Sequence, residues 1–161
     1  MNEHTDNRRV YSAQSDQHAS NNYLTSLMFP SEDYCLLRAE MPAGIIVPLH
    51  SHADRESFYA LSGEMDLYYD DSWRVLKPGE CVDVLNNTKH AWRNASGASA
   101  SLLVVTTVRM GVFLQQISSF VETEGSTQKE HFFELVKKYG YWLGSPEDNE
   151  AIGLSTNWQG R

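Results

Sequence analysis

The chain has 161 residues, of which 41% are hydrophobic, and its formal net charge at pH 7 is −8. This length suits one domain with a single core, and the acidic balance argues against a nucleic-acid-binding surface, which needs a stripe of basic side chains. No apolar run reaches the length of a membrane span, and the N-terminal segment lacks the apolar core of a signal peptide. We therefore expect a cytoplasmic protein that binds neither nucleic acid nor membranes.

The N-terminal segment and the central part of the chain differ in pattern. Residues 1–22 are polar and show no hydrophobic period, which is typical of a disordered or loosely attached arm. From residue 23 to 117, short segments rich in β-branched and aromatic residues alternate with turn-forming Gly, Pro, Asn and Asp. This pattern predicts an all-β protein with an antiparallel sandwich or barrel. The last strand is expected to be long, over residues 99–117 (SASLLVVTTVRMGVFLQQI).

The pattern changes to helical spacing after residue 117. Residues 127–130 have the form of a capping box and predict a helix over 128–139, while Pro146 is placed to open a second short helix. The expected organisation is an arm (1–22), a β-barrel (23–117) and a helical C-terminal extension (118–161) packed on the barrel. Two alternative roles for these helices are a lid over a pocket and a dimer contact.

The segment from residue 44 to 63 (GIIVPLHSHADRESFYALSG) contains three side chains that often bind metals. His50 and His52 lie two apart in an expected strand, so both rings point to one face with their Cα atoms roughly 6.6 Å apart. A reversal of the following polar segment returns Glu56 opposite this pair, and His90 is a sequence-distant fourth ligand. Three nitrogens and one carboxylate suit one divalent transition-metal ion (iron, manganese, nickel, copper or zinc) rather than calcium or magnesium.

These residues resemble the two sequence motifs of the cupin superfamily. The first motif is matched by Gly44, His50, His52, Glu56 and Gly63 with intervals of five, one, three and six residues, and the second by Gly79, His90 and Asn94. The chain departs from the second motif at Leu85, usually proline, and at Asn87, usually glycine, although asparagine tolerates left-handed backbone better than most residues. The resemblance implies a jelly-roll (cupin) barrel, a bound metal and, by analogy, a homodimer, and the two short C-terminal helices predicted above would follow this barrel.

Alternation along the strands extends the expected site beyond the four ligands. With Glu56 pointing inward, Phe58 shares its face, and with His90 inward, Trp92 does the same. Phe58 and Trp92 are therefore candidate walls of a substrate pocket, with ordinary barrel packing as the alternative. Pockets for small molecules are themselves mostly apolar and aromatic.

Other polar residues of the expected barrel are interpreted as surface residues. Arg38 and Arg109 could each anchor an acidic substrate group, but the solvent face of their strands is the preferred interpretation. Asp54 and Arg55, in the ligand loop, are expected at the surface. Proton transfer beside the metal would depend on one of the remaining barrel side chains: Tyr68, Tyr69 or Glu64.

The reaction class depends on the resemblance, because cupins include oxygenases, isomerases, lyases, decarboxylases and binding proteins. The first expectation is a metal-dependent dioxygenase, similar to quercetinases, that acts on a small aromatic or enol-type molecule with Glu56 as base. The first alternative is a non-redox isomerase or lyase of a small carbonyl or sugar-type substrate, in which the metal acts as a Lewis acid. The second is a cupin that binds a small molecule without converting it.

Overall fold

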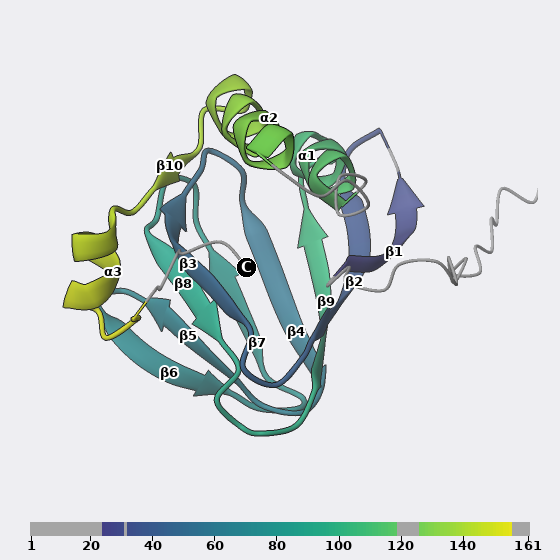
Figure 1. Ribbon diagram of the computed structural model, residues 1–161. Coiled ribbons are helices and arrows are strands. Elements are labelled where there is room, and N and C mark those ends of the chain that lie inside the picture. Colours follow the sequence, from purple (N-terminus) through teal and green to yellow (C-terminus); the bar gives the residue numbers. More distant parts are fainter. Residues whose placement is uncertain (1–23, 31, 119–125, 156–161) are drawn as a thin grey trace, which may run out of the picture.

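The computed structural model describes residues 24–30, 32–118 and 126–155, and its strands form two antiparallel sheets that face each other (Figure 1). The first sheet has the order β1 (Leu24–Pro30), β2 (Cys35–Met41), β9 (Ala100–Thr106), β4 (Glu56–Ser62), β7 (Cys81–Val84). The second has the order β10 (Trp142–Leu143), β3 (Ile46–Ser51), β8 (His90–Arg93), β5 (Met65–Tyr69), β6 (Ser72–Leu76). The predicted all-β jelly-roll barrel is confirmed, whereas the arm predicted over residues 1–22 lies outside the described residues.

Alternating side chains explain how each sheet buries one face. Along β4, Glu56, Phe58 and Ala60 are buried while Tyr59 and Leu61 are exposed, so the predicted alternation is confirmed up to an irregularity after Ala60. The inward residues of both sheets form the main core cluster between them. This cluster includes Ile45, Phe58 and Ala60 of the 44–63 segment, so the barrel core adjoins the predicted site.

The prediction that the last strand continues beyond residue 106 is wrong, because the chain forms the helix α1 (Val108–Ser118) there. Thr107 caps the helix, since its Oγ1 accepts a hydrogen bond from the Met110 backbone N–H at 3.0 Å. Met110 and Phe113 are buried and Ile117 is partly buried at helical spacing, although many of the residues in this segment also favour strands. Gly111 lets α1 approach β2 closely, because a Cβ there would meet the Cys35 side chain.

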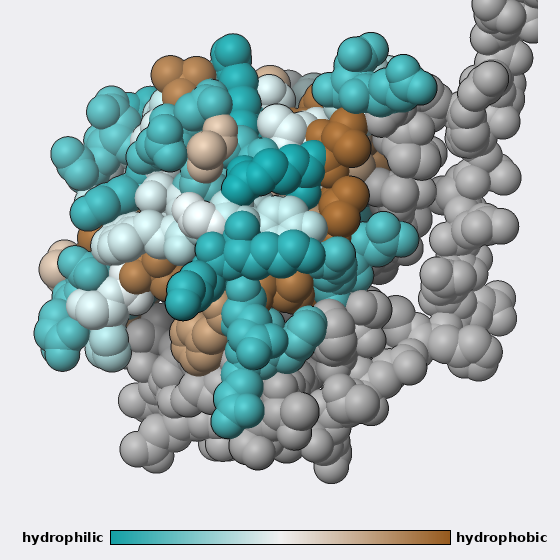
Figure 2. All heavy atoms as spheres, turned by 90° about the horizontal axis from the view of Figure 1, so that it is seen from above, coloured by the Kyte–Doolittle hydropathy of each residue, from teal (hydrophilic) through white to brown (hydrophobic). Residues whose placement is uncertain are grey.

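The helices α1 and α2 (Ser126–Lys138) lie together at one end of the barrel, and α3 (Pro146–Ala151) lies beside the second sheet (Figure 1). The two predicted C-terminal helices are confirmed, with Pro146 in the first turn of α3, and α1 adds a third. Residues 127–129 of the predicted capping box have side chains outside the described part. Figure 2 looks onto the end with α1 and α2, where hydrophilic side chains cover most of the described surface. Within the described residues, no helix is long and apolar enough to cross a membrane.

Asn149 of α3 attaches the C-terminal segment to β3, the strand that carries His50. The Asn149 side chain is buried, accepts a hydrogen bond from the Leu49 backbone N–H at 2.8 Å and donates to the carbonyls of Gly144 and Ser145. Replacing it leaves these buried backbone groups without partners. We expect Asn149→Ala to lower the free energy of unfolding by about 2 kcal/mol in urea denaturation. Ser145→Ala, which removes only the exposed α3 cap, should cost about 1 kcal/mol, and equal losses would contradict this role for Asn149.

Candidate metal centre

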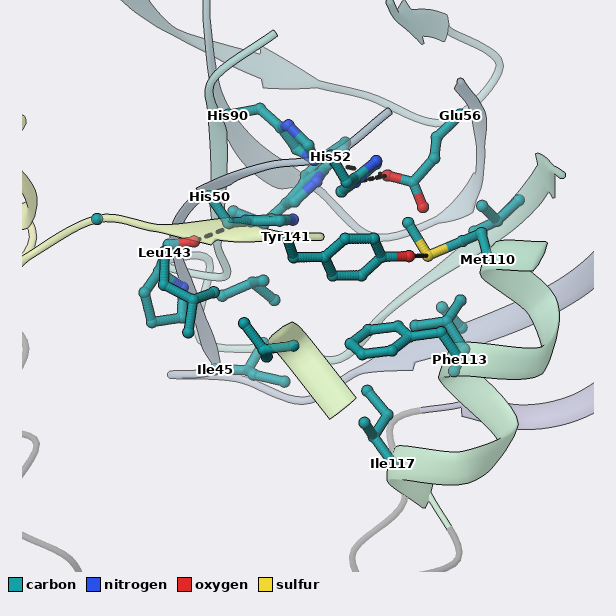
Figure 3. A pocket seen from close by; sticks show the side chains of 18 of the residues that line it. Ile45, His50, His52, Glu56, His90, Met110, Phe113, Ile117, Tyr141 and Leu143 are labelled. Carbon is teal, nitrogen blue, oxygen red and sulfur yellow. Dashed lines mark hydrogen bonds and ion pairs between the residues drawn. The ribbon is translucent and has the colours of Figure 1, made fainter. Parts of the chain in front are cut away.

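The two sheets bring the four predicted ligands together from three strands and one loop (Figure 3). His50 on β3 lies directly opposite His90 on β8 in the sheet register, and their ring centroids are 4.1 Å apart. His52 follows β3 in the loop that crosses to the other sheet, where Glu56 begins β4. The nearest ring nitrogens of the three histidines all lie within 4.8 Å of one another, so these side chains could hold one metal ion.

A backbone carbonyl two residues away fixes the orientation of each imidazole. The Nδ1 atom of His50 lies 2.8 Å from the carbonyl oxygen of Pro48, that of His52 2.9 Å from Asp54, and that of His90 2.9 Å from Thr88. A carbonyl only accepts hydrogen bonds, so each Nδ1 carries the proton and each Nε2 keeps a free lone pair. This is the tautomer that a metal-binding histidine needs.

The free lone pairs face a carboxylate rather than a hydrogen-bond donor. Glu56 Oε2 lies 3.2 Å from His52 Nε2 and 3.5 Å from His90 Nε2. Both buried Nε2 atoms lack a hydrogen-bond partner. Buried polar atoms without a partner beside a carboxylate fit a site for a cation. The donor set therefore fits a transition-metal ion.

Burial and the neighbouring rings set the charge states of this cluster. Burial, with a further contribution from His90, lowers the pKa of His50 to about 3, so this imidazole is neutral at physiological pH. Burial alone raises the pKa of Glu56, but the adjacent imidazoles of His52 and His90 lower it more, to about 2. The cluster thus offers a neutral imidazole and a carboxylate, the forms that bind metals.

The second motif supports the ligand loop of the first. The backbone N–H of Asn87 donates to the His52 carbonyl at 2.6 Å, and Asn86 Nδ2 donates to the Ala53 carbonyl at 2.6 Å. Asn87 has a φ of 61°, in the left-handed region that the family's usual glycine adopts easily. The departure from the motif at this position therefore preserves the backbone conformation.

The motif spacing, the two-sheet barrel and the converging histidines agree with a comparison of the chain with known families. Residues 37–106 match the model of the cupin domain family (Cupin_2). The protein belongs to the cupin superfamily. Among the curated proteins, none matches this sequence.

Two solved structures share this fold at low sequence identity, and a third is similar in sequence to half of this chain. A protein with a double-stranded β-helix domain from Klebsiella pneumoniae is 18% identical over 62% of this chain and 90% of its own, with a TM-score of 0.51. The polyketide cyclase RemF from Streptomyces resistomycificus is 20% identical over 63% of this chain and 79% of its own, also at 0.51. TT1209 from Thermus thermophilus is 30% identical over 50% of this chain and 77% of its own, at 0.47.

The cupin barrel contains an apolar cavity of about 570 Å³, with the histidine cluster in its wall. This volume lies within the range of roughly 300–1,000 Å³ that is usual for small-molecule sites. Phe58 and Trp92 both line it, with ring centroids 4.6 Å apart, as the alternation predicted. Their contact with a substrate stays a prediction, as does metal binding by His50, His52, Glu56 and His90. Leu114, Ile117 and residues of α2 complete the wall at the helical end.

Asp54 is buried, so its expected position at the surface is wrong. Its carboxylate accepts hydrogen bonds from Thr107 and, at 2.6 Å, from Arg109 at the start of α1. Arg109 therefore pairs with the ligand loop and does not lie in a strand. Arg55 is exposed and bound to Asp83, in agreement with expectation.

Sequence reasoning missed Tyr141, which carries the one hydroxyl group in the described cavity lining. It lies between α2 and β10, far along the chain from the motifs, and no pattern marks it. The three expected candidates for proton transfer, Tyr68, Tyr69 and Glu64, do not line the cavity. Arg38 pairs with Glu40 and Ser101, on the solvent face as expected.

Proposed function

We propose that this cupin is a metal-dependent oxygenase that acts on a small, mostly apolar aromatic or enol-type molecule. The observation that supports it most is the cluster of His50, His52 and His90 in the wall of an apolar cavity, with ligand atoms within 4.8 Å of one another and Glu56 3.2 Å from His52 Nε2. His50, His52 and His90 would supply nitrogen ligands and Glu56 an oxygen ligand. A redox-active ion bound there, such as iron, manganese, nickel or copper, would supply positions for dioxygen and a substrate oxygen.

The residues around the cluster suit a flat substrate and the exclusion of water. The rings of Phe58 and Trp92 offer aromatic surface beside Glu56, which precedes Phe58 on the same face of β4. The remaining lining consists mostly of aliphatic and aromatic side chains, which keep water away from reactive oxygen species. Glu56 is ionised and can accept a proton from an enol or phenol group of a bound substrate.

A non-redox reaction is the second candidate, and the hydroxyl of Tyr141 favours it. This phenol lines the same cavity as the histidines and could protonate a substrate oxygen or carbon. The described lining contains no lysine or arginine to pair with the charge of a sugar phosphate or keto acid. Among the substrates of this alternative, an uncharged carbonyl compound is the one that the side chains of the lining suit best.

Oxygen consumption tests the proposal directly. Protein loaded with iron, manganese, nickel or copper should consume oxygen, measured with an electrode, in the presence of at least one member of a panel of flavonols, enols and small catechols. Glu56→Gln removes the negative charge and the base while keeping the shape, so the rate should fall at least about 100-fold. A flat oxygen trace with every metal, together with isomerisation or elimination of an uncharged carbonyl compound, would replace the oxygenase with the second candidate.

A further inference from the structure

Tyr141 occupies a position from which it can contact both the metal centre and a ligand in the cavity. Its ring extends from the segment before β10 between the histidines and Phe113 (Figure 3), with ring centroids 4.9 Å from His52 and 4.3 Å from Phe113. The hydroxyl end points toward Met110 of α1. Packing on both faces of the ring fixes the position of this hydroxyl relative to the cluster.

The hydroxyl of Tyr141 has only weak or already engaged acceptors. It lies 2.9 Å from the Met110 sulfur, a weak acceptor, and 3.3 Å from Asp54 Oδ2. That carboxylate already accepts hydrogen bonds from Arg109 and Thr107. A ligand oxygen at normal hydrogen-bonding distance would be a stronger acceptor than the Met110 sulfur and closer than the 3.3 Å contact with Asp54, so the O–H can turn toward it.

The phenol of Tyr141 can donate a hydrogen bond at neutral pH. An ordinary tyrosine hydroxyl has a pKa of about 10 and therefore keeps its proton there. Tyr141 is thus a donor for an acceptor atom of a ligand in the cavity.

The other polar groups of the lining are already assigned to other roles. Asn149 uses its whole amide group on backbone partners. The three histidines donate from Nδ1 to backbone carbonyls, which leaves acceptors only. Two side-chain donors thus remain in the described lining, the Tyr141 hydroxyl and the indole N–H of Trp92, and no lysine or arginine accompanies them.

We propose that Tyr141 binds the oxygen of an uncharged, mostly apolar aromatic ketone or phenol, and so selects the substrate class of this site. The inference rests on the proposed function in taking the cavity as the substrate site, and it adds the donor and the charge that the substrate must have. A neutral oxygen can accept a hydrogen bond from the phenol. In the metal-free protein, a carboxylate in the cavity would instead face Glu56 without a lysine or arginine beside it.

Three ligands with one ring system test this inference on the full chain after removal of metal by a chelator. They are 2-acetylnaphthalene, 2-ethylnaphthalene and 2-naphthoate, and their affinities are measured by displacement of the neutral dye N-phenyl-1-naphthylamine. Tyr141→Phe should lower the ratio of acetyl to ethyl affinity about fivefold, the effect of one neutral hydrogen bond. Tyr139→Phe is the matched control, because its hydroxyl bonds Gln116 at 3.2 Å and does not line the cavity, and the ratio should not change.

A second test compares a charged with an uncharged ligand on the metal-free wild-type protein, so it needs no variant. 2-Naphthoate should bind wild-type protein at least about tenfold more weakly than 2-acetylnaphthalene, because its charge is buried without a partner. An unchanged acetyl-to-ethyl ratio in Tyr141→Phe, equal binding of naphthoate, or failure of all three ligands to displace the dye would each overturn the inference. If Tyr141→Phe does not fold, Tyr141→Leu, which also lacks the donor, takes its place.

Metal-free binding separates this inference from the proposed reaction. A fivefold change in the affinity ratio without oxygen uptake by any metal form would support the role of Tyr141 and reject the oxygenase. Oxygen uptake together with an unchanged acetyl-to-ethyl affinity ratio would support the oxygenase and reject the role of Tyr141.

Discussion

Replacing His50 and His90 together with alanine should reduce the metal content of the purified protein to background. The two rings lie opposite each other in the register of β3 and β8, and their loss removes two of the three imidazoles that converge on one point. His52 and Glu56 would remain, and two ligands at this spacing bind a transition metal only weakly. Inductively coupled plasma mass spectrometry of wild-type and variant protein, prepared in parallel, measures the effect.

A histidine outside the barrel provides the control for this experiment. His131 of α2 pairs with Glu134 at 3.5 Å at the protein surface, so His131→Ala should leave the metal content unchanged. Full metal content in the His50→Ala/His90→Ala variant would show that the ligand assignment is wrong. A loss in the His131 variant as well would point to adventitious binding by surface histidines.

The site residues that could be predicted are those whose spacing in the sequence indicates the direction of their side chains. His50 lies in β3, His52 follows that strand in the loop rather than in it as predicted, and Glu56 begins the next strand. The parity of β4 and β8 placed Phe58 and Trp92 correctly in the interior, because the regular period of two converts sequence position into direction. Two sheets that face each other then bring these directions to one point.

The parts that could not be predicted depend on contacts between distant segments. The stretch over 107–117 is rich in residues that favour strands, yet Thr107 caps a helix there, and the helix is held by packing on β2 and α2. Tyr141 enters the cavity only because α1 and α2 lie over the end of the barrel. The local secondary-structure propensity of a segment does not depend on packing between distant segments. The position of α1 and α2 at the cavity could therefore not be predicted from the sequence.

Asp54 shows the same limitation and explains how the helical end is joined to the metal centre. As a polar residue in a loop it suggested a surface position, but only 4% of its side chain is exposed because Thr107, Arg109 and Tyr141 surround the carboxylate. Its backbone carbonyl accepts the Nδ1–H of His52. One residue therefore connects α1 and the segment before β10 to the orientation of a predicted metal ligand.

Asp54→Ala should lower the free energy of unfolding by about 3 kcal/mol, because a buried carboxylate with three partners is lost and its donors are left unsatisfied. For a protein of this size, the melting temperature should fall by about 6–12 °C. Metal affinity should fall about tenfold as well, because the Asp54 carbonyl no longer holds His52 in place as firmly. Urea denaturation, calorimetry and competition with a chromogenic chelator measure the three effects.

The next residue in the chain gives a matched control, since Arg55 and Asp83 also form an ion pair, but an exposed one. Their side chains are 59% and 35% exposed, so Arg55→Ala should lower the free energy of unfolding far less than Asp54→Ala and leave metal affinity unchanged. The two variants change neighbouring positions of the same loop and differ mainly in the burial of the pair they break. Equal stability losses for Asp54→Ala and Arg55→Ala, or a normal metal affinity in Asp54→Ala, would show that the buried pair does not connect the helices to the metal centre.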